Sequence, residues 1–487
     1  MNQPSDQTFP RIPGVNSLKV HPVILITIIS SLVLLGCSIL RHELFQSNAF
    51  DLGIFDNGVY LISQGQKPFV AFRGIHIFGD HAAWILYPIA LLYKIYPSVY
   101  WLLGIQAVAL AGGAIPTWLL ALKAGLKPDL AGAIAGIYLL YPLVFNVNLF
   151  DFHPEVIALP LLLGAVLMAR LNQIPGFTVA IVLILGCKAV LALTVMALGF
   201  WLLWCENKRK AGIIAITSGL AWFLIATFVI IPHFSGAAPP AIGRYDILGN
   251  SVGEIITNLV LKPEIVLQQL FTLPNLEYVV LLIIPVIWGL SPRHFAPLIG
   301  AIPTLVLNLL SDSQQQKNLT QQYGLPILPF LLLGVISTLA AGRGWLRSPR
   351  KMIVWSLIAF LALAKYGYFW SRYLKHIDTV SATRAAISLV STQGSVLTAD
   401  QITSHLTHRS IVMLATLDTE LQNLSQFKYI LLNRSYPGWG SSPEFVSELI
   451  QELKSVPQFE LLYQRDGVFL FVQQSRKGLG KSDLNMK

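Results

Sequence analysis

Long apolar runs repeat along most of this chain, and they constrain its fold more than any other feature. Most are about 15–23 residues long, enough helix to cross a hydrocarbon core of about 30 Å. Of the 487 residues, 54% are hydrophobic and only 12% are charged. No alternating barrel pattern is present, so the spans are expected to be helices that satisfy their own backbone hydrogen bonds. The sequence therefore predicts an all-α membrane protein with several spans.

The distribution of basic residues predicts which way the spans run. Lys and Arg cluster in short turns between alternate apolar runs, which is the pattern of cytoplasmic loops. It predicts about eleven transmembrane helices, a cytoplasmic N-terminal tail (1–21), a transmembrane domain (22–370) and an outer C-terminus. The first run, 22–40, lacks a small-residue cleavage site, so we interpret it as a retained span. Because the clustering also explains the net charge of +10, we predict no nucleic-acid partner.

Two apolar segments are not expected to cross as single helices. The run 176–204 is too long for one crossing and carries Lys188 in its middle. Two short helices that meet near Lys188 would keep the basic cluster 208–210 inside, so we predict a break there. Residues 82–96 are interrupted by a lysine and a proline, which favours a helix lying in the membrane interface.

The composition changes after about residue 376, where a small α/β domain (371–475) is expected outside the membrane. Ser442 before Pro443 is a typical helix start, and Asp466-Gly467 between apolar runs is typical of a hairpin. Strands are predicted at 395–399, 410–415 and 428–432, a helix over DQITSHLTH, and a disordered tail at 476–487.

The first outer loop, 41–98, concentrates polar residues that the spans lack. Asp51 is followed fourteen residues later by Gly65, and the pattern between them predicts a short helix with Asp51 in its first turn. Asp56 lies about one turn further on. Either carboxylate could act as a general base towards an acceptor hydroxyl or amine. Asp51 could equally serve only as a helix cap, since acidic side chains stabilise helix N-termini.

Further ionisable residues stand at predicted outer membrane edges. Asp80 and His81 could bind a metal, contact phosphate oxygens or cap the following helix. Asp151, His153 and Glu155 could line a site or hold a divalent cation, or they could form a solvated loop with Glu155 as a cap. The spacing matches no specific metal motif, so no residue is assigned as a metal ligand.

Two basic residues are candidates for contact with phosphate. Charged groups near hydrocarbon are costly, so Lys188 either neutralises a lipid phosphate or snorkels to the interface. Arg244, on a second long outer loop at about 232–276, could also meet phosphate or be solvated. No Walker loop, dinucleotide fingerprint, nucleophile elbow or HExxH motif is present.

Three motifs together resemble a bacterial membrane family, domain-of-unknown-function family number 2079. They are FDLGIFDNGVY (50–60), GDHAAWILYPI (79–89) and FDFHPEVIALPLLL (150–163), and the resemblance extends over about residues 30–470. That family is similar in layout to the GT-C integral membrane glycosyltransferases, which use a polyprenyl-phosphate sugar. The GT-C enzymes keep a catalytic aspartate in the first outer loop, at the start of a short helix that ends at a glycine.

The resemblance implies a GT-C-like protein of the bacterial inner membrane with a polyprenyl-phosphate sugar donor and membrane lipids as partners. Asp51 would then be the base, with Asp56 as the second candidate, and Lys188 and Arg244 would neutralise the carrier phosphate. The remaining candidates would shape the donor pocket or hold a divalent cation: Asp80, His81, Asp151, His153 and Glu155.

Two departures from the family pattern leave other functions open. Relatives often read Lys-Glu-Asp where this chain has Lys188-Ala189-Val190, and His-Tyr where it has Gln322-Tyr323. A non-catalytic or degenerate scaffold for envelope polysaccharide assembly would tolerate these changes. A lipid or sugar transporter is another alternative, although it would be expected to show paired broken helices in two related halves.

Overall fold

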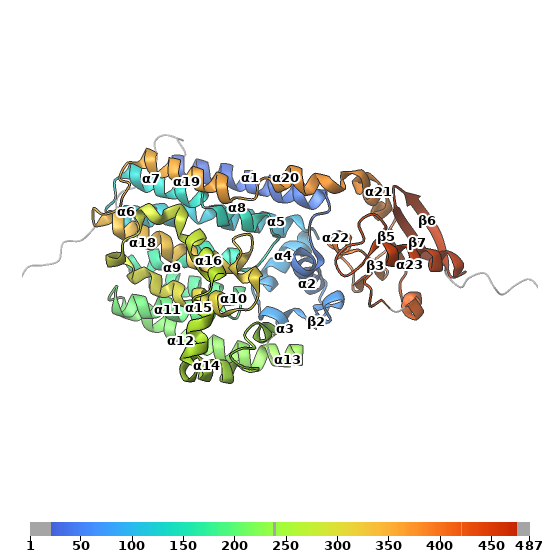
Figure 1. Cartoon of the computed structure of the whole chain (residues 1–487), viewed down its shortest axis with the longest axis horizontal. Coiled ribbons are helices and arrows are strands. Elements are labelled where there is room, and N and C mark those ends of the chain that lie inside the picture. Colours follow the sequence, from blue (N-terminus) through green and yellow to red (C-terminus); the bar gives the residue numbers. More distant parts are fainter. Residues whose placement is uncertain (1–20, 237–239, 420, 475–487) are drawn as a thin grey trace, which may run out of the picture.

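The computed structural model describes residues 21–236, 240–419 and 421–474. These residues form a large helical bundle with a smaller sheet-containing domain at one end (Figure 1). The predicted N-terminal tail, apart from His21, and the predicted C-terminal tail lie outside the described residues.

The described residues form twenty-one α-helices before the sheet of the smaller domain, and the last of them, α21, packs against that sheet. They are α1 (Pro22–Glu43), α2 (Ile54–Ser63), α3 (Ile77–His81), α4 (Leu86–Ile95), α5 (Tyr100–Gly112), α6 (Ala114–Lys123), α7 (Pro128–Leu139), α8 (Pro142–Asn148), α9 (Glu155–Arg170), α10 (Ile174–Cys187), α11 (Leu191–Trp204), α12 (Arg209–Ile225), α13 (Ile231–Ser235), α14 (Val252–Leu261), α15 (Pro263–Leu270), α16 (Leu273–Ile283), α17 (Ile302–Leu310), α18 (Leu328–Ala340), α19 (Pro349–Leu363), α20 (Tyr368–Ser371) and α21 (Ile377–Ser388). A two-stranded hairpin, β1 (Phe69–Val70) and β2 (Ile75–His76), precedes α3.

Six helical stretches of the described chain are long and apolar enough to cross a membrane, or seven if one bent pair counts as a span. The six are Pro22–Glu43, Tyr100–Lys123, Pro128–Asn148, Arg209–Ser235, Gln322–Ala340 and Pro349–Ser388. The predicted total of about eleven is not confirmed, because several of the expected spans are shorter apolar helices of 10–17 residues. Prolines near the starts of α10 and α17 contribute to this segmentation.

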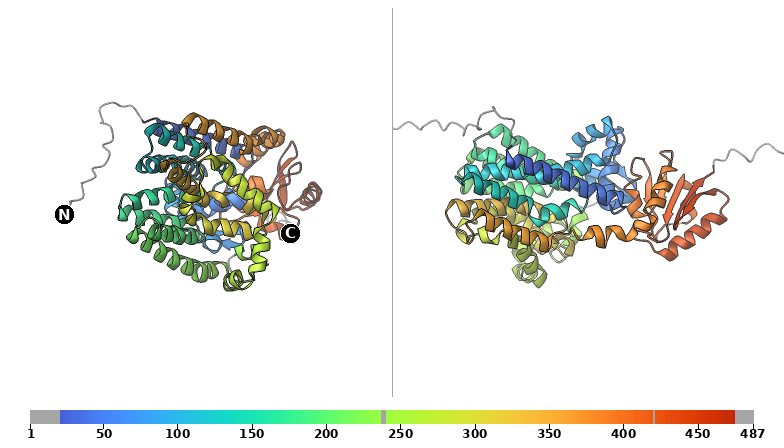
Figure 2. Two further views of the ribbon diagram at one scale, coloured as in Figure 1. Left: turned by 60° about the vertical axis from the view of Figure 1, so that its left-hand side comes forward. Right: turned by 90° about the horizontal axis from the view of Figure 1, so that it is seen from above.

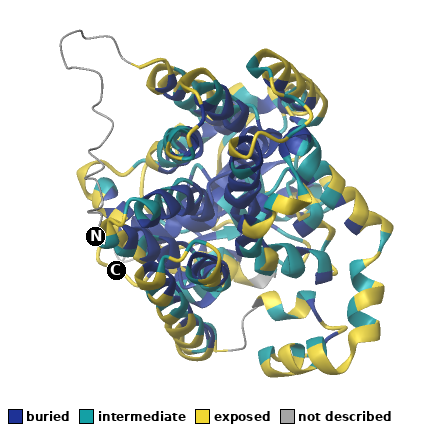
Figure 3. Cartoon of the chain, turned by 90° about the vertical axis from the view of Figure 1, so that its left-hand side faces the viewer, coloured by how far each residue is buried: buried dark blue, intermediate teal, exposed yellow. Residues whose placement is uncertain are grey.

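The outer faces of the bundle are apolar, as a bilayer requires. Figure 3 shows buried residues gathered at the centre of the bundle and exposed ones on the outward faces of the helices. On α1, Leu25, Ile28 and Leu32 are exposed, and Leu32 retains 63% of its accessible surface. Such surfaces suit lipid contact, since large exposed apolar patches are rare on soluble proteins.

The predicted break in 176–204 is present. Helix α10 ends at Cys187, Lys188 has an extended backbone (φ −165°, ψ 140°), and α11 begins at Leu191. Helix α11 then packs against α12 so closely that a Cβ added at Gly199 would lie 2.8 Å from the Gly212 carbonyl oxygen. The two half-helices therefore carry Lys188 at the turn between them.

The predicted short helix after the first span is also present, with a different start. A π-helical turn, η1 (Ala49–Gly53), carries Asp51 and leads directly into α2. Gly65 follows α2 with φ +69°, a left-handed conformation that glycine adopts without strain.

The C-terminal domain contains a five-stranded sheet in the order β4-β3-β5-β7-β6. Its elements are β3 (Val396–Thr398), α22 (Asp400–Thr403), β4 (Val412–Leu414), β5 (Tyr429–Asn433), α23 (Pro443–Ser455), β6 (Phe459–Arg465) and β7 (Val468–Gln473). Strand β3 pairs in parallel with β4 and β5, and β7 pairs antiparallel with β5 and β6. Figure 2 shows this sheet beyond one end of the bundle.

Most local predictions for this domain are confirmed. The Ser442 hydroxyl accepts a hydrogen bond from the Phe445 amide (3.1 Å) at the start of α23. Asp466 and Gly467 form the hairpin turn with φ of +48° and +78°. The helix predicted over DQITSHLTH is only one short turn, α22, because Ser404 turns instead to the Asn48 carbonyl of the bundle (3.0 Å).

Candidate active site

Asp151, in the segment before α9, is held by two partners. Asp151, in a left-handed backbone conformation (φ +101°), pairs with Arg41 at the end of α1, and both side chains are buried. Its second oxygen accepts a hydrogen bond from the Asn48 amide (3.0 Å). Because a positive φ is uncommon for a residue with a side chain, the ion pair and this bond hold the segment in place.

Asp51 and His153 form the centre of the site. His153 Nε2 lies 3.4 Å from Asp51 Oδ1, and Asn48 Nδ2 donates to Asp51 Oδ2 (3.1 Å). His153 Nδ1 lies 3.3 Å from the Asp151 carbonyl oxygen, which fixes the ring orientation. His153 is nearly inaccessible, with 5% of its side chain exposed, whereas Asp51 retains 19%. Asp51 is therefore accessible to a substrate, while the buried His153 holds the Asp51 carboxylate in position.

The electrostatics keep Asp51 in its charged form. Burial by itself would raise the pKa of Asp51, but the hydrogen bond and charge of His153 outweigh burial, so the pKa lies below its ordinary value. Burial would lower the pKa of His153, and the Asp51 carboxylate reverses that direction. The two groups thus stabilise each other's ionised forms.

A second cluster surrounds Lys188 at the turn between α10 and α11. Lys188 Nζ lies 2.5 Å from Glu155 Oε1, while Glu155 Oε2 is buried with no hydrogen-bond partner among the described residues. The turn is fastened to segment 41–98 by two backbone hydrogen bonds of 3.0 Å, from the Ala189 amide to the His81 carbonyl and from the Ile85 amide to the Gly186 carbonyl. The chain therefore brings residues about one hundred positions apart to one place.

Asp80 and His81 form a pair beside that turn. His81 Nδ1 lies 3.0 Å from Asp80 Oδ2, and Arg73 lies 3.9 Å from the other Asp80 oxygen. Burial would raise the pKa of Asp80, but His81 and Arg73 hold it below its ordinary value. Asp80 is thus a charged carboxylate that lies beside a histidine and an arginine.

Tyr323 links Lys188 to Arg244. The Lys188 ammonium lies 5.5 Å from the centre of the Tyr323 ring, and the Arg244 guanidinium lies 5.3 Å from it. Such distances are typical of cation–π contacts. Two cations from widely separated loops therefore share one aromatic ring, an arrangement that the sequence patterns did not indicate.

Asp56, the second candidate base, occupies a different environment. Its side chain is fully buried, and it accepts hydrogen bonds from Tyr93 (2.5 Å) and from the Thr407 hydroxyl. His408 Nε2 also lies 3.3 Å from it. Asp56 therefore joins segment 41–98 to the C-terminal domain. No spacing in the sequence marked Thr407 and His408 as its partners.

The C-terminal domain also reaches the Asp51 turn through Asp400. Asp400 Oδ1 accepts a hydrogen bond from the Ala49 amide (2.9 Å). Burial raises the pKa of Asp400 to about 6, and the charges of Asp51 and Asp151 act in the same direction. No signal in the sequence placed Asp400 at the site, because its contact depends on docking across more than three hundred residues.

The predicted residues thus gather into one connected cluster, with Asp56 on its interdomain side. The three ionisable residues of the DFHPE segment face three different partners rather than one another. Asp151 faces Arg41, His153 faces the Asp51 carboxylate, and Glu155 faces Lys188. Within the described residues, no group of three or more His, Cys, Asp or Glu side chains is arranged to hold a metal ion.

Comparisons with known proteins agree with this architecture. The family model described as "Predicted membrane protein (DUF2079)" matches residues 41–470. The crystal structure of ArnT from Cupriavidus metallidurans bound to undecaprenyl phosphate is similar in fold, with a TM-score of 0.51 and 11% identity over 93% of this chain and 98% of that one. The apo ArnT structure aligns over 92% and 97%, with a TM-score of 0.46 and 11% identity. None of the curated proteins matches.

Proposed function

Because the chain belongs to the DUF2079 family of predicted membrane proteins, and because its fold resembles that of ArnT, we propose that it is a GT-C-type glycosyltransferase. It would transfer a sugar from a polyprenyl-phosphate carrier to an envelope acceptor on the outer face of the membrane. The observation that carries this proposal is the cluster itself. A partly exposed, charged Asp51 lies in the first outer loop, connected through the DFHPE segment to Lys188 and Arg244.

In the proposed reaction, Asp51 accepts the proton of an acceptor hydroxyl. The acceptor oxygen forms a bond to the sugar C1, and the bond between C1 and the carrier phosphate oxygen breaks. The electron pair leaves with the phosphate, whose growing charge Lys188 and Arg244 would neutralise. His153 would hold the Asp51 carboxylate in position and in its charged form.

Lys188 is suited to binding a phosphate reversibly. In the structure its charge is matched by Glu155, and the two form a single short contact. An arriving phosphate would offer the ammonium further acceptors and strengthen its charge-assisted hydrogen bonding. Asp80 and His81 would shape the same pocket, since the turn that carries Lys188 is hydrogen-bonded to the His81 backbone.

We also propose the orientation of the chain. The N-terminus would be cytoplasmic, the C-terminal domain would lie outside a bacterial inner membrane, and the shorter helices would complete about eleven crossings. The site faces the C-terminal domain through Asp400 and Thr407, so the two must share one side of the membrane. The basic turns at 208–210 and 343–351 would then lie in the cytoplasm.

The decisive experiment is a transfer assay with a polyprenyl-phosphate sugar and purified protein, comparing wild type with Asp51→Asn. A general base typically contributes about 10²–10⁴-fold, so the variant should lose that much of its transfer rate. Asp129→Asn is a matched control, because Asp129 is an exposed carboxylate at the start of α7. If Asp51→Asn transferred sugar at the wild-type rate, Asp51 would not be the general base.

One observation favours a second function, that of a non-catalytic scaffold. Ala189, which stands where the family resemblance implies an acid, is buried in a small apolar cluster with Ala82, Ala226 and Ile231. A scaffold would bind undecaprenyl phosphate at Lys188 and form no glycosidic bond. Binding without any transfer, over a panel of donors, would support it.

A further inference from the structure

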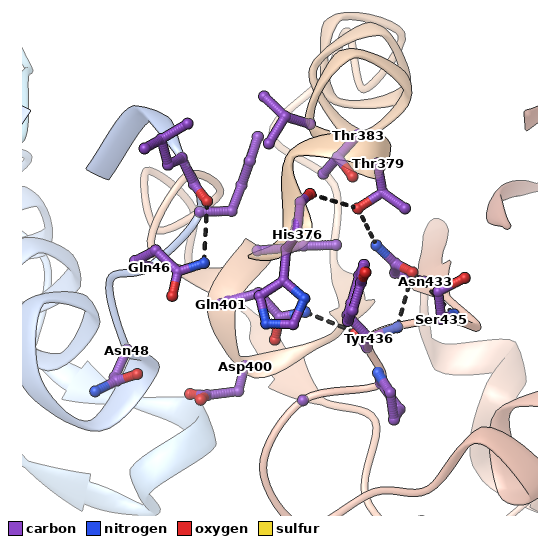
Figure 4. Close-up of a pocket in the computed structure, with 16 residues that line it drawn as sticks. Gln46, Asn48, His376, Thr379, Thr383, Asp400, Gln401, Asn433, Ser435 and Tyr436 are labelled. Carbon is purple, nitrogen blue, oxygen red and sulfur yellow. Dashed lines mark hydrogen bonds between the residues drawn. The ribbon is translucent and has the colours of Figure 1, made fainter. Parts of the chain in front are cut away.

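A second pocket lies next to the proposed base, between the end of α1 and the C-terminal domain. Its volume is about 290 Å³, near the lower end of the range of small-molecule sites. One wall comes from the stretch 44–48, and the other comes from α21, α22 and the turn after β5. Figure 4 shows Asn48 and Asp400 on one side of the pocket, with His376 in the middle of the view and Tyr436 beside it.

The lining of this pocket mixes polar and apolar side chains and contains no lysine or arginine. Four side-chain amides and four hydroxyls supply most of its polar groups, and the structure describes all of its lining residues. Asp400 is the one carboxylate, and its Oδ2 has no hydrogen-bond partner within the described part of the chain. An anionic ligand would meet repulsion here, whereas a neutral ligand with several hydroxyls would find donors and acceptors.

The aromatic side chains of the pocket add a surface for a ring. The His376 and Tyr436 rings lie with centroids 3.7 Å apart, and His376 Nδ1 is buried without a hydrogen-bond partner in the described residues. A buried ring nitrogen without a partner costs free energy that a ligand hydroxyl would recover. Tyr436 and Pro437 also line the pocket, and the C–H groups of a sugar ring can pack against apolar ring atoms of this kind.

The pocket is joined to the proposed base by direct contacts. Asn48 lines the pocket, and its Nδ2 donates to Asp51 Oδ2 (3.1 Å). Asp400 lines it as well, and it holds the backbone of Ala49, two residues before Asp51. A ligand in the pocket would therefore touch both residues that position the Asp51 turn.

We propose that this pocket binds one neutral, hydroxyl-rich carbohydrate unit of the acceptor, with Asp400 and Asn48 holding it beside Asp51. The role of this ligand as the acceptor rests on the proposed function. The binding of a neutral sugar in this pocket does not depend on it. The carrier phosphate would bind elsewhere, at the cations Lys188 and Arg244. Donor and acceptor would thus be separated by charge, the anion on one side of Asp51 and the neutral sugar on the other.

Saturation-transfer NMR on the full chain tests the binding directly. The protein is purified in a detergent without a sugar head group, and the probes are methyl β-D-glucoside and methyl N-acetyl-β-D-glucosaminide. Glucose 6-phosphate is the anionic comparator. Wild type should saturate at least one neutral glycoside strongly and the phosphate weakly. Gln46→Trp should abolish the signal by filling the pocket, and Asp400→Asn should weaken binding about tenfold.

A matched control comes from the other cavity of the C-terminal domain. Gln451 is an exposed residue that lines this cavity of about 230 Å³, so Gln451→Trp should leave glycoside binding unchanged. Melting curves identify any variant that fails to fold, and Asp400→Asn, which keeps the shape of the side chain, then carries the test. Absence of glycoside binding by wild type, equal binding by folded Gln46→Trp, or preference for glucose 6-phosphate would overturn the proposal.

The same samples separate this inference from the proposed function. Glycoside binding that Gln46→Trp removes, in a protein that neither binds undecaprenyl phosphate nor transfers sugar, would retain the carbohydrate site and refute the transferase. Transfer that persists with unchanged acceptor KM in Gln46→Trp would refute the acceptor pocket and retain the transferase.

Discussion

At the scale of single residues, the site depends on pairing each buried carboxylate with a cation from another element. Removing one partner from such a pair is far more damaging than the small net value of the pair suggests, because an uncompensated charge stays behind. Asp51 is more accessible than the paired carboxylates Asp151 and Glu155, since 19% of its side chain is exposed. This combination of support and access is what a reacting carboxylate needs, and it leads to two predictions.

The first concerns His153. The hydrogen bond and charge of His153 lower the pKa of Asp51 against the effect of burial. In His153→Gln the pKa of Asp51 should rise, so a larger fraction of Asp51 is protonated at acidic pH and the base is lost earlier. The acidic limb of the pH–rate profile for sugar transfer should therefore move to higher pH, with a smaller change at alkaline pH. An equal loss of rate at every pH would indicate only a structural role.

The second concerns the two cations at Tyr323. Lys188→Gln and Arg244→Gln should each weaken binding of undecaprenyl phosphate by about tenfold or more, since hydrogen bonds to charged groups contribute about 1.5–3 kcal/mol. Binding to wild type should also weaken as salt is raised, and less steeply in either variant. Lys262→Gln is a control at an exposed lysine between α14 and α15. Equal binding by wild type and both variants would place the carrier phosphate elsewhere.

At the scale of elements, the sequence predicted local structure well and long-range contacts poorly. The break at Lys188, the start of α23 at Ser442 and the turn at Asp466 all follow from nearby residues, and each is present. The π-helical turn at Asp51 and the shortening of α22 depend on partners elsewhere in the chain, such as the bond from Ser404 to Asn48. Periodicity carries no information about such contacts.

The same limit applied to the candidate residues. Asp51, His153, Glu155 and Lys188 could be selected one by one as charges at membrane edges, and the structure brings them together. They could be selected without knowledge of the fold, because burying a charge near hydrocarbon costs free energy and therefore indicates a functional or structural role. Asp400 lies in a polar domain where charges are ordinary, so nothing in its surroundings distinguished it.

The contact between α2 and the segment after α22 leads to a third prediction. Burial would lower the pKa of His408, but the Asp56 carboxylate raises it above its ordinary value of 6.5. Protonated His408 thus stabilises the docked domain below pH 6.5, and this stability is lost as pH rises through the folded-state pKa. His405, with a pKa lowered to about 4 by burial, acts oppositely and opposes docking as pH falls below 6.5.

Melting of the purified protein in detergent checks this prediction. Wild type should lose stability as the pH is raised from 6.5, and His408→Gln should show a flatter dependence in that range. The acid-side loss of stability should remain in His408→Gln, because His405 is untouched. An identical alkaline slope in both proteins would show that the His408–Asp56 pair does not control docking.

At the scale of the whole molecule, the proposed orientation requires the two ends of the bundle to face opposite sides of a membrane. The native Cys205 is exposed, and it lies just before the basic cluster 208–210. Glu460 is exposed on β6 of the C-terminal domain. A membrane-impermeant maleimide should therefore distinguish these two positions by the side from which it is added.

In intact spheroplasts, Cys205 should stay unlabelled, and it should react once the membrane is opened. Glu460→Cys, made in a Cys205→Ser background, should react in both preparations, while Cys205→Ser alone should react in neither. The other two cysteines should contribute little, because Cys187 is buried and Cys37 lies in the apolar helix α1. Labelling of both sites from the same side would contradict the orientation. That result would also contradict the proposed location of Asp51 on the outer side, because Asp400 and Thr407 bind segment 41–98 to the C-terminal domain.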